Sequence, residues 1–161
     1  MGNQRSYVKP KQLFLLFAKG EAVTWTLLIS ALIIRAAGDP IPHVVTIAGS
    51  IHGAVFLGYA VTALLAGINQ RWSFGRLATA VGLAIVPFAT IPFERRLVAT
   101  SALEGGWRTA KSEDPRDDFF IDAIFRWFIA RPIVLLAVLL VAVPAVFAFL
   151  LFLGPPTQWF E

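Results

Sequence analysis

The sequence predicts an all-α polytopic membrane helical bundle with four transmembrane helices and one interfacial amphipathic helix. Of its 161 residues, 57% are hydrophobic and only 15% are charged, and the mean hydropathy is +0.71. A soluble domain carries roughly 25% charged residues, and a chain of this size exposes a large share of its surface. The surplus apolar surface therefore requires lipid, and we expect a multi-pass membrane protein.

Four apolar segments supply the predicted spans, because a hydrocarbon core of about 30 Å takes about 20 helical residues. The first segment ends before Pro40 and Pro42, and the fourth ends at Gly154-Pro155-Pro156. The third is the shortest, and two prolines in its last turns are expected to kink it or to make its end irregular buried backbone. The segments are 13–34, 44–68, 77–93, which contains Pro87 and Pro92, and 133–153, which contains Pro144.

The basic residues indicate two orientations that four crossings cannot satisfy together. Lys9 and Lys11 precede the first span and place the N-terminus in the cytoplasm, whereas Arg126 and Arg131 place the stretch before the fourth span there as well. Either one of these signals is overruled or the segment 77–93 re-enters the membrane without crossing it. We expect four crossings with both termini on one side, and the side stays open.

The polar stretch after the third segment divides the chain into a three-helix membrane domain, residues 1–97, and an extension, residues 98–161. Within the extension, residues 117–130 are too few to cross a bilayer. Carboxylates and a guanidinium recur every fourth residue on one helical face, and aromatic residues cover most of the rest, which is typical of an amphipathic helix at the interface. These charged residues are Asp118, Asp122 and Arg126. The charged loop before them is interpreted as solvated.

The composition excludes several kinds of chemistry. The absence of cysteine excludes disulfides, thiolate metal sites and iron–sulfur clusters. The net charge of +4 comes from basic residues that flank apolar runs, so we expect contact with lipid and no binding of nucleic acid. His43 and His52 lie about 13 Å apart along one helix and cannot hold one haem iron from both sides. We expect no enzyme activity, no catalytic residue, no cofactor and no metal site.

The second span carries small side chains on one helical face. In lipid, close approach of two helices depends on small residues, because burial of apolar surface alone does not drive association. This face is therefore predicted to pack against another helix, either in the same chain or in a partner. Its residues are Gly49, Ser50, Gly53, Ala54, Gly58, Thr62 and Ala66.

Glu21 and His52 are ionisable side chains inside the predicted spans, where such groups are costly and are treated as functional candidates. In an antiparallel pair of the first two spans, Glu21 and His52 differ in depth by less than about 10 Å. A contact between them, direct or through water, is possible and would lock the two helices together. The alternatives are a structural histidine that is hydrogen-bonded elsewhere, and a path for a transported solute.

A combined pattern runs through the first three segments: an intramembrane glutamate, an Ile-His-Gly motif followed by Phe and Tyr, a Trp and an Arg in the next loop, and Pro-Phe-x-Thr before an acid–Arg anchor. The residues are Glu21, Ile51, His52, Gly53, Phe56, Tyr59, Trp72, Arg76, Pro87, Phe88, Thr90, Phe93, Glu94 and Arg95. By this pattern, residues from about 13 to 97 resemble the bacterial family of small integral membrane proteins with domain of unknown function 3817. The resemblance implies location in the bacterial plasma membrane and transfers no activity.

Size, number of spans and the lack of cofactor ligands are also similar to those of the accessory subunits of actinobacterial cytochrome bcc–aa3 respiratory supercomplexes. We therefore expect a non-catalytic accessory or assembly subunit that contacts lipid and the other subunits of a larger membrane complex. The alternative is a small transporter or channel protomer with Glu21 and His52 in the path.

Overall fold

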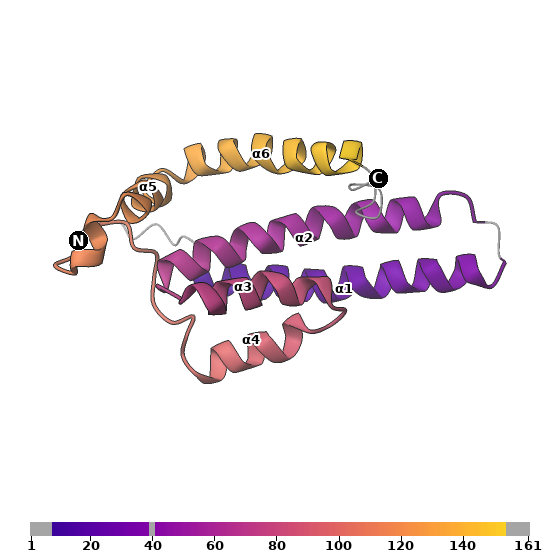
Figure 1. The fold of residues 1–161 in the computed structure, drawn as a ribbon, viewed down its shortest axis with the longest axis horizontal. Coiled ribbons are helices and arrows are strands. Elements are labelled where there is room, and N and C mark those ends of the chain that lie inside the picture. Colours follow the sequence, from indigo (N-terminus) through magenta and orange to yellow (C-terminus); the bar gives the residue numbers. More distant parts are fainter. Residues whose placement is uncertain (1–7, 39–40, 154–161) are drawn as a thin grey trace.

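The computed structural model describes residues 8–38 and 41–153, and these residues form a fold of α-helices and short 3-10 turns without a strand (Figure 1). Of the predicted helix stops, Pro40 and the Gly154-Pro155-Pro156 end lie outside the described residues. The elements are α1 (Pro10–Ala36), α2 (Val44–Asn69), α3 (Phe74–Gly82), η1 (Leu83–Ile85), α4 (Thr90–Ala99), η2 (Pro115–Asp118), α5 (Phe120–Ile129) and α6 (Pro132–Leu153).

Three helices, α1, α2 and α6, are long and apolar enough to cross a membrane, with 27, 26 and 22 residues. They cover the predicted spans 13–34, 44–68 and 133–153, which are confirmed as apolar helices. Pro10 stands in the first turn of α1, where a missing N–H leaves no intrahelical bond unmade. α6 continues as a helix through Pro144.

The predicted third span over residues 77–93 is not a continuous helix, and four transmembrane helices are not confirmed. Val86 follows η1 with extended backbone, φ −100° and ψ 121°, which is the conformation that a following proline favours. Pro87 therefore stops the helix. At 1.5 Å per residue, α3 with η1 is about 18 Å long and α4 about 15 Å, so neither can cross a core of about 30 Å.

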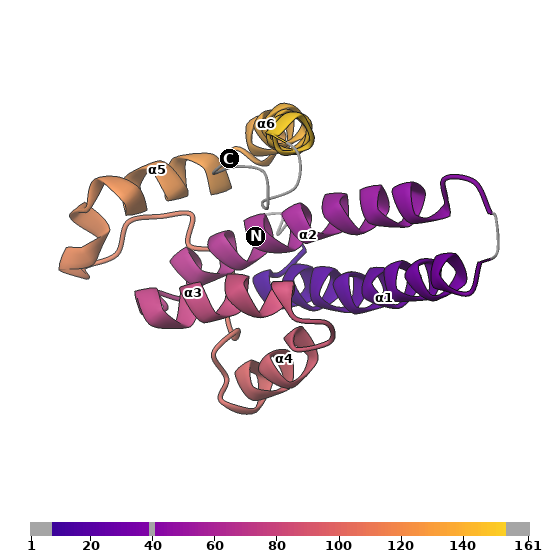
Figure 2. The same ribbon diagram turned by 45° about the vertical axis from the view of Figure 1, so that its right-hand side comes forward.

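The segment 74–99 instead forms a helical hairpin, which we call the re-entrant hairpin. α3 runs along α2 away from its C-terminal end, and α4 runs back toward the same end (Figures 1 and 2). Phe88 lies in the turn with a φ of +63°. Pro92 is the third residue of α4, a position whose N–H has no partner within the helix. This course of the chain is the one that the re-entrant alternative for the third segment requires, and re-entry into the membrane stays a prediction.

The core is formed by α1, α2, the re-entrant hairpin and the loop that follows it. α1 and α2 pack side by side in opposite directions, as Figure 1 shows. α6 contributes no buried residue and meets α2 where the ring of Phe147 lies over Gly53. The buried apolar residues of the core are Phe14, Ala18, Tyr59, Ala63, Ala66, Ala80, Ala84, Leu97 and Leu103. Leu103 and Ala102 of the predicted extension thus pack with the membrane domain.

The predicted amphipathic helix over 117–130 is divided. The 3-10 turn η2 ends at Asp118, Phe119 has extended backbone with φ −65° and ψ 140°, and α5 follows. α5 keeps an apolar face and a polar face and leads into α6. The division into domains 1–97 and 98–161 stays a prediction.

Candidate functional site

Hydrogen bonds and ion pairs link two groups of polar side chains in the fold, and each group contains a buried acid, Glu21 in one and Asp117 in the other. The first, the intramembrane polar cluster, joins α1 and α2 to the re-entrant hairpin and consists of Glu21, Thr24, Trp25, His52, Tyr59 and Thr90. The second, the arginine–aspartate cluster, lies at the C-terminal end of α2 and consists of Arg71, Arg108, Ser112, Asp114, Asp117, Asp122 and Arg126.

Glu21 is the buried carboxyl of the intramembrane polar cluster, with no exposed surface. Its Oε2 accepts a hydrogen bond of 2.8 Å from the hydroxyl of Thr90, the first residue of α4. Its Oε1 is buried and has no hydrogen-bond partner among the described residues. An unbonded polar atom is costly in an apolar environment, so Oε1 of Glu21 is the unsatisfied atom of this cluster among the described residues.

His52 is also buried and faces α1. Its Nδ1 lies 3.0 Å from the hydroxyl of Thr24, and this hydroxyl donates to the backbone carbonyl of Glu21 at 3.0 Å. Since the hydroxyl has one hydrogen, it accepts from Nδ1–H of His52 when it donates to that carbonyl. The rings of Trp25 and His52 lie 4.4 Å apart. The structure therefore joins His52 to the backbone at Glu21 through Thr24, and the partner of the Glu21 carboxyl is Thr90.

Two side chains of α1 and α2 bind the backbone where the hairpin leaves regular helix. Trp25 Nε1 donates to the carbonyl of Ala84 at 3.2 Å, and the Tyr59 hydroxyl donates to the carbonyl of Ala80 at 3.0 Å. Carbonyls at the end of a helix lack partners within it. Irregular backbone at membrane depth is tolerated only where it is buried in protein. Trp25 and Tyr59 therefore stabilise the break in the third segment.

The predicted small-residue face of α2 is divided between two helices of this chain. A Cβ on Gly58 would collide with the ring of Phe17 in α1, and a Cβ on Gly53 would lie 2.7 Å from the ring of Phe147 in α6. A Cβ on Gly49 would make an ordinary contact of 3.9 Å with α1. Of the other residues of this face, Thr62 and Ala66 are buried, Ser50 is half-buried and Ala54 is exposed.

The arginine–aspartate cluster is not predicted by the sequence, from which a solvated loop is expected here. Asp117 is only 2% exposed. Its Oδ1 lies 2.7 Å from Arg71, 2.8 Å from Arg108 and 3.1 Å from Arg126. Its Oδ2 accepts hydrogen bonds from the hydroxyl and the backbone N–H of Ser112. The hydrogen bonds from Ser112, followed by the charges of Arg71 and Arg126, hold the pKa of Asp117 well below its ordinary value.

This cluster fastens the loop to the end of α2. Arg108 donates to the carbonyls of Ile68 and Asn69 in the last turn of α2 and forms an ion pair of 2.6 Å with Asp122 in α5. A cation is favourable at the C-terminal end of a helix. Arg71 also pairs with Asp114. The one local signal in the sequence is the Ser112-Glu113-Asp114-Pro115 turn, because the three arginines lie far apart along the chain.

No three His, Asp or Glu side chains are grouped as metal ligands in the part of the chain that the structure describes. The expectations of no cofactor and no catalytic residue stay predictions.

Comparison with known proteins places the chain in a family. No solved structure matches it. A protein of Streptomyces coelicolor, named as a candidate membrane protein, is 36% identical over 75 residues, which are 46% of this chain. The chain spans only 9% of the length of that relative. The model of a family described as a domain of unknown function (DUF3817) matches residues 11–99, which hold α1, α2 and the re-entrant hairpin. The chain is thus a multi-pass membrane protein, and it belongs to the DUF3817 family.

Proposed function

We propose that this chain is a non-catalytic accessory subunit of a larger complex in the bacterial plasma membrane, which it stabilises by packing against partner subunits. The observation that carries the proposal is the length of the Streptomyces coelicolor relative, of which the similar region is only 9%. In that protein the module is a small part of a much larger chain. A module that is covalently joined to a larger membrane protein in one case can serve as a separate subunit in another.

The contacts of the intramembrane polar cluster support a structural role. Thr90 binds Glu21, His52 binds Thr24, and the side chains of α1 and α2 bind carbonyls of the re-entrant hairpin. Each of these bonds joins two elements of the fold. Hydrogen bonds of this kind hold membrane helices together where apolar burial cannot.

The re-entrant hairpin also supports a definite topology, with three crossings, a cytoplasmic N-terminus and a C-terminus on the opposite side. In this topology Lys9 and Lys11 at the start of α1, and Arg126 and Arg131 before α6, all lie on the cytoplasmic side, as the positive-inside rule requires. The conflict between the two orientation signals disappears because the segment 74–99 enters from the cytoplasm and returns to it.

The first partner to test is the actinobacterial respiratory supercomplex. The full chain with a C-terminal tag is extracted in mild detergent, and the proteins that co-purify in fixed stoichiometry are identified by mass spectrometry, with the untagged chain as control. We expect subunits of one membrane complex, and subunits of the cytochrome oxidase support the respiratory assignment. A homogeneous homo-oligomer without a partner contradicts the accessory role.

A competing function is a small transporter or channel protomer with Glu21 and His52 in the path. The observation that favours it is the buried Oε1 of Glu21, which has no partner among the described residues and lies at the start of α4. Discontinuous helices at membrane depth line substrate sites in many transporters. Solute flux into liposomes that contain only the purified chain, abolished by Glu21→Gln, would establish transport and refute the accessory role.

A further inference from the structure

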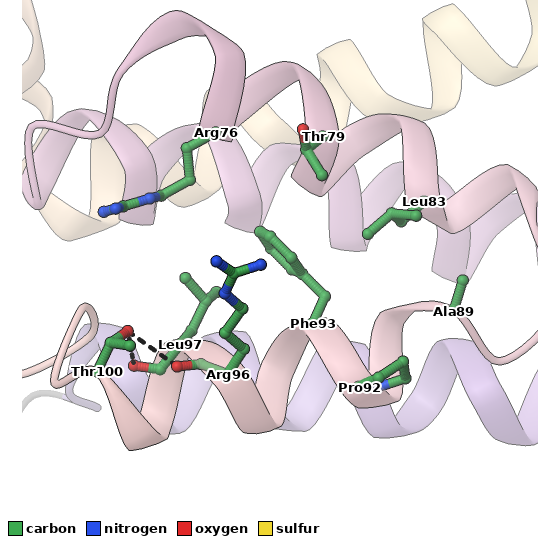
Figure 3. A pocket seen from close by; sticks show the side chains of 9 residues that line it. All are labelled: Arg76, Thr79, Leu83, Ala89, Pro92, Phe93, Arg96, Leu97 and Thr100. Atoms are coloured by element: carbon green, nitrogen blue, oxygen red, sulfur yellow. Dashed lines mark hydrogen bonds between the residues drawn. The ribbon is translucent and has the colours of Figure 1, made fainter.

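A cleft of about 550 Å³ opens between the two helices of the re-entrant hairpin. Its mouth, at the end where α3 begins and α4 ends, is lined by Arg76 and Arg96. Toward the tip of the hairpin, Leu83 and Pro92 line it, and Phe93 lies between the two ends (Figure 3). The cleft is thus basic at one end and mostly apolar along the rest, and its lining also includes the hydroxyl-bearing side chains of Thr79 and Thr100. None of these side chains belongs to either polar cluster.

The two guanidiniums of the cleft have no acidic partner among the described residues. Neither Arg76 nor Arg96 makes a side-chain hydrogen bond or ion pair with any residue of the described ranges, whereas Arg71 and Arg108 nearby are each paired with two aspartates. Glu94 precedes Arg96 by two residues, about 200° around α4, and so points away from the cleft. Two like charges that line one cleft repel each other, and an anion between them removes the repulsion.

The hydroxyl groups of the cleft are already used as donors. Thr79 donates to the carbonyl of Gly75, and Thr100 donates to the carbonyl of Arg96. The guanidiniums are therefore the hydrogen-bond donors that the cleft offers to a ligand. A planar guanidinium binds two oxygens of a phosphate at once, which makes arginine well suited to phosphate.

We propose that this cleft binds one anionic phospholipid, with the phosphodiester between Arg76 and Arg96 and an acyl chain along Leu83 and Phe93. Basic pockets between membrane helices on the cytoplasmic side bind anionic headgroups. A free phosphate would leave the apolar walls without an occupant. An acidic peptide would have to bury backbone N–H and C=O groups against those walls, which is costly. The proposal rests on the topology proposed above, which places the mouth of the cleft on the cytoplasmic side, and it is independent of the accessory role.

The test is native mass spectrometry of the purified full chain with added phosphatidylglycerol or with phosphatidylcholine of the same acyl chains. We expect phosphatidylglycerol to bind in preference to phosphatidylcholine. Each arginine near a lipid surface contributes about fivefold to the affinity for anionic lipid, so the double variant Arg76→Gln/Arg96→Gln binds phosphatidylglycerol about 25-fold more weakly. The matched control, Arg35→Gln/Arg95→Gln, removes the same charge outside the cleft and retains the binding.

Several outcomes overturn the proposal. The proposal is wrong if the wild type and Arg76→Gln/Arg96→Gln bind phosphatidylglycerol equally well. It is also wrong if the matched control loses as much affinity as the double variant, because the attraction is then not specific to the cleft. If inorganic phosphate displaces phosphatidylglycerol when both are present at the same concentration, the ligand of the cleft is free phosphate and the lipid proposal is wrong. Where the double variant does not fold, as judged by circular dichroism, Thr79→Phe fills the cleft and keeps both charges. We expect Thr79→Phe to lose phosphatidylglycerol, and retention of the lipid contradicts the proposal.

Discussion

The hydrogen bond from Thr90 to Glu21 joins the re-entrant hairpin to α1 and can be removed without changing the shape of the core. Thr90 has no exposed surface, and its hydroxyl donates to Oε2 of Glu21 at 2.8 Å. Valine has nearly the same shape as threonine, so Thr90→Val removes the donor and leaves no cavity. Because Oε1 already lacks a partner, the carboxyl of the variant has no hydrogen-bond donor among the described residues.

The size of the effect follows from two bounds. A buried polar group that loses its partner costs about 1–3 kcal/mol, whereas side-chain hydrogen bonds between membrane helices average about 0.6 kcal/mol and reach about 1.7 kcal/mol. The complete burial of both residues favours the upper part of the second range. We therefore expect Thr90→Val to lower the free energy of unfolding by about 1–2 kcal/mol, a change of roughly 5- to 30-fold in the unfolding equilibrium.

The measurement is the unfolding free energy in bicelles, determined by steric trapping for a double-mutant cycle with Glu21→Leu. Leucine removes the acceptor, so Thr90→Val in the Glu21→Leu background is expected to cost almost nothing. The difference between the two backgrounds is the coupling energy of the pair, for which we expect about 1 kcal/mol or more. An equal cost of Thr90→Val in both backgrounds would refute the assignment of stability to this bond.

Three further predictions concern packing, pH and topology. Gly58→Leu should destabilise the chain by about 1–3 kcal/mol, because the new side chain collides with the aromatic ring of Phe17 on α1. Gly82→Ala should stabilise the chain by about 0.4–1 kcal/mol, because a Cβ at this position meets no atom within 4 Å. The assay is thermal unfolding in detergent, and a melting temperature of Gly58→Leu at or above that of Gly82→Ala contradicts the packing described here. Because the pKa of Asp117 is lowered in the folded chain, its contribution is complete above the ordinary aspartate pKa of about 4 and is lost only as the pH falls below that value. The loop should therefore resist proteolysis at pH 4 in the wild type, and Asp117→Asn should be cleaved already at neutral pH; equal resistance of both proteins speaks against the cluster. Single cysteines introduced by Ser73→Cys and Thr109→Cys should react with an impermeant thiol reagent from the same side of the membrane. Reaction from opposite sides would instead indicate the four-crossing topology.

The positions of the long helices could be predicted because their cause is local. α1, α2 and α6 are continuous apolar runs bounded by polar residues or prolines, and any such run of about 20 residues forms a helix in lipid. The break in the third segment could be predicted from the sequence only in part. Pro87 and Pro92 marked irregular backbone, but a re-entrant hairpin also depends on Trp25 and Tyr59, which bind carbonyls of α3 and η1 from other helices.

The candidate site was predictable to a similar extent. Glu21 and His52 stood out because ionisable side chains are rare at membrane depth. Their partners did not stand out: Thr90 lies 69 residues from Glu21 along the chain, and a threonine in an apolar segment carries no signal of its own. The burial of Asp117 could not be predicted, because its three arginines come from different elements.

The sequence by itself determined three properties of this protein: that it is a membrane protein, which residues form its long helices, and to which family it belongs. These properties depend on composition and on residues close together in the chain. Only the tertiary structure decided that the third segment turns back, that Thr90 binds Glu21 and that Arg76 and Arg96 line one cleft. Hydrogen bonds and ion pairs between distant residues require that the helices first come together, and their geometry exists only in the folded chain.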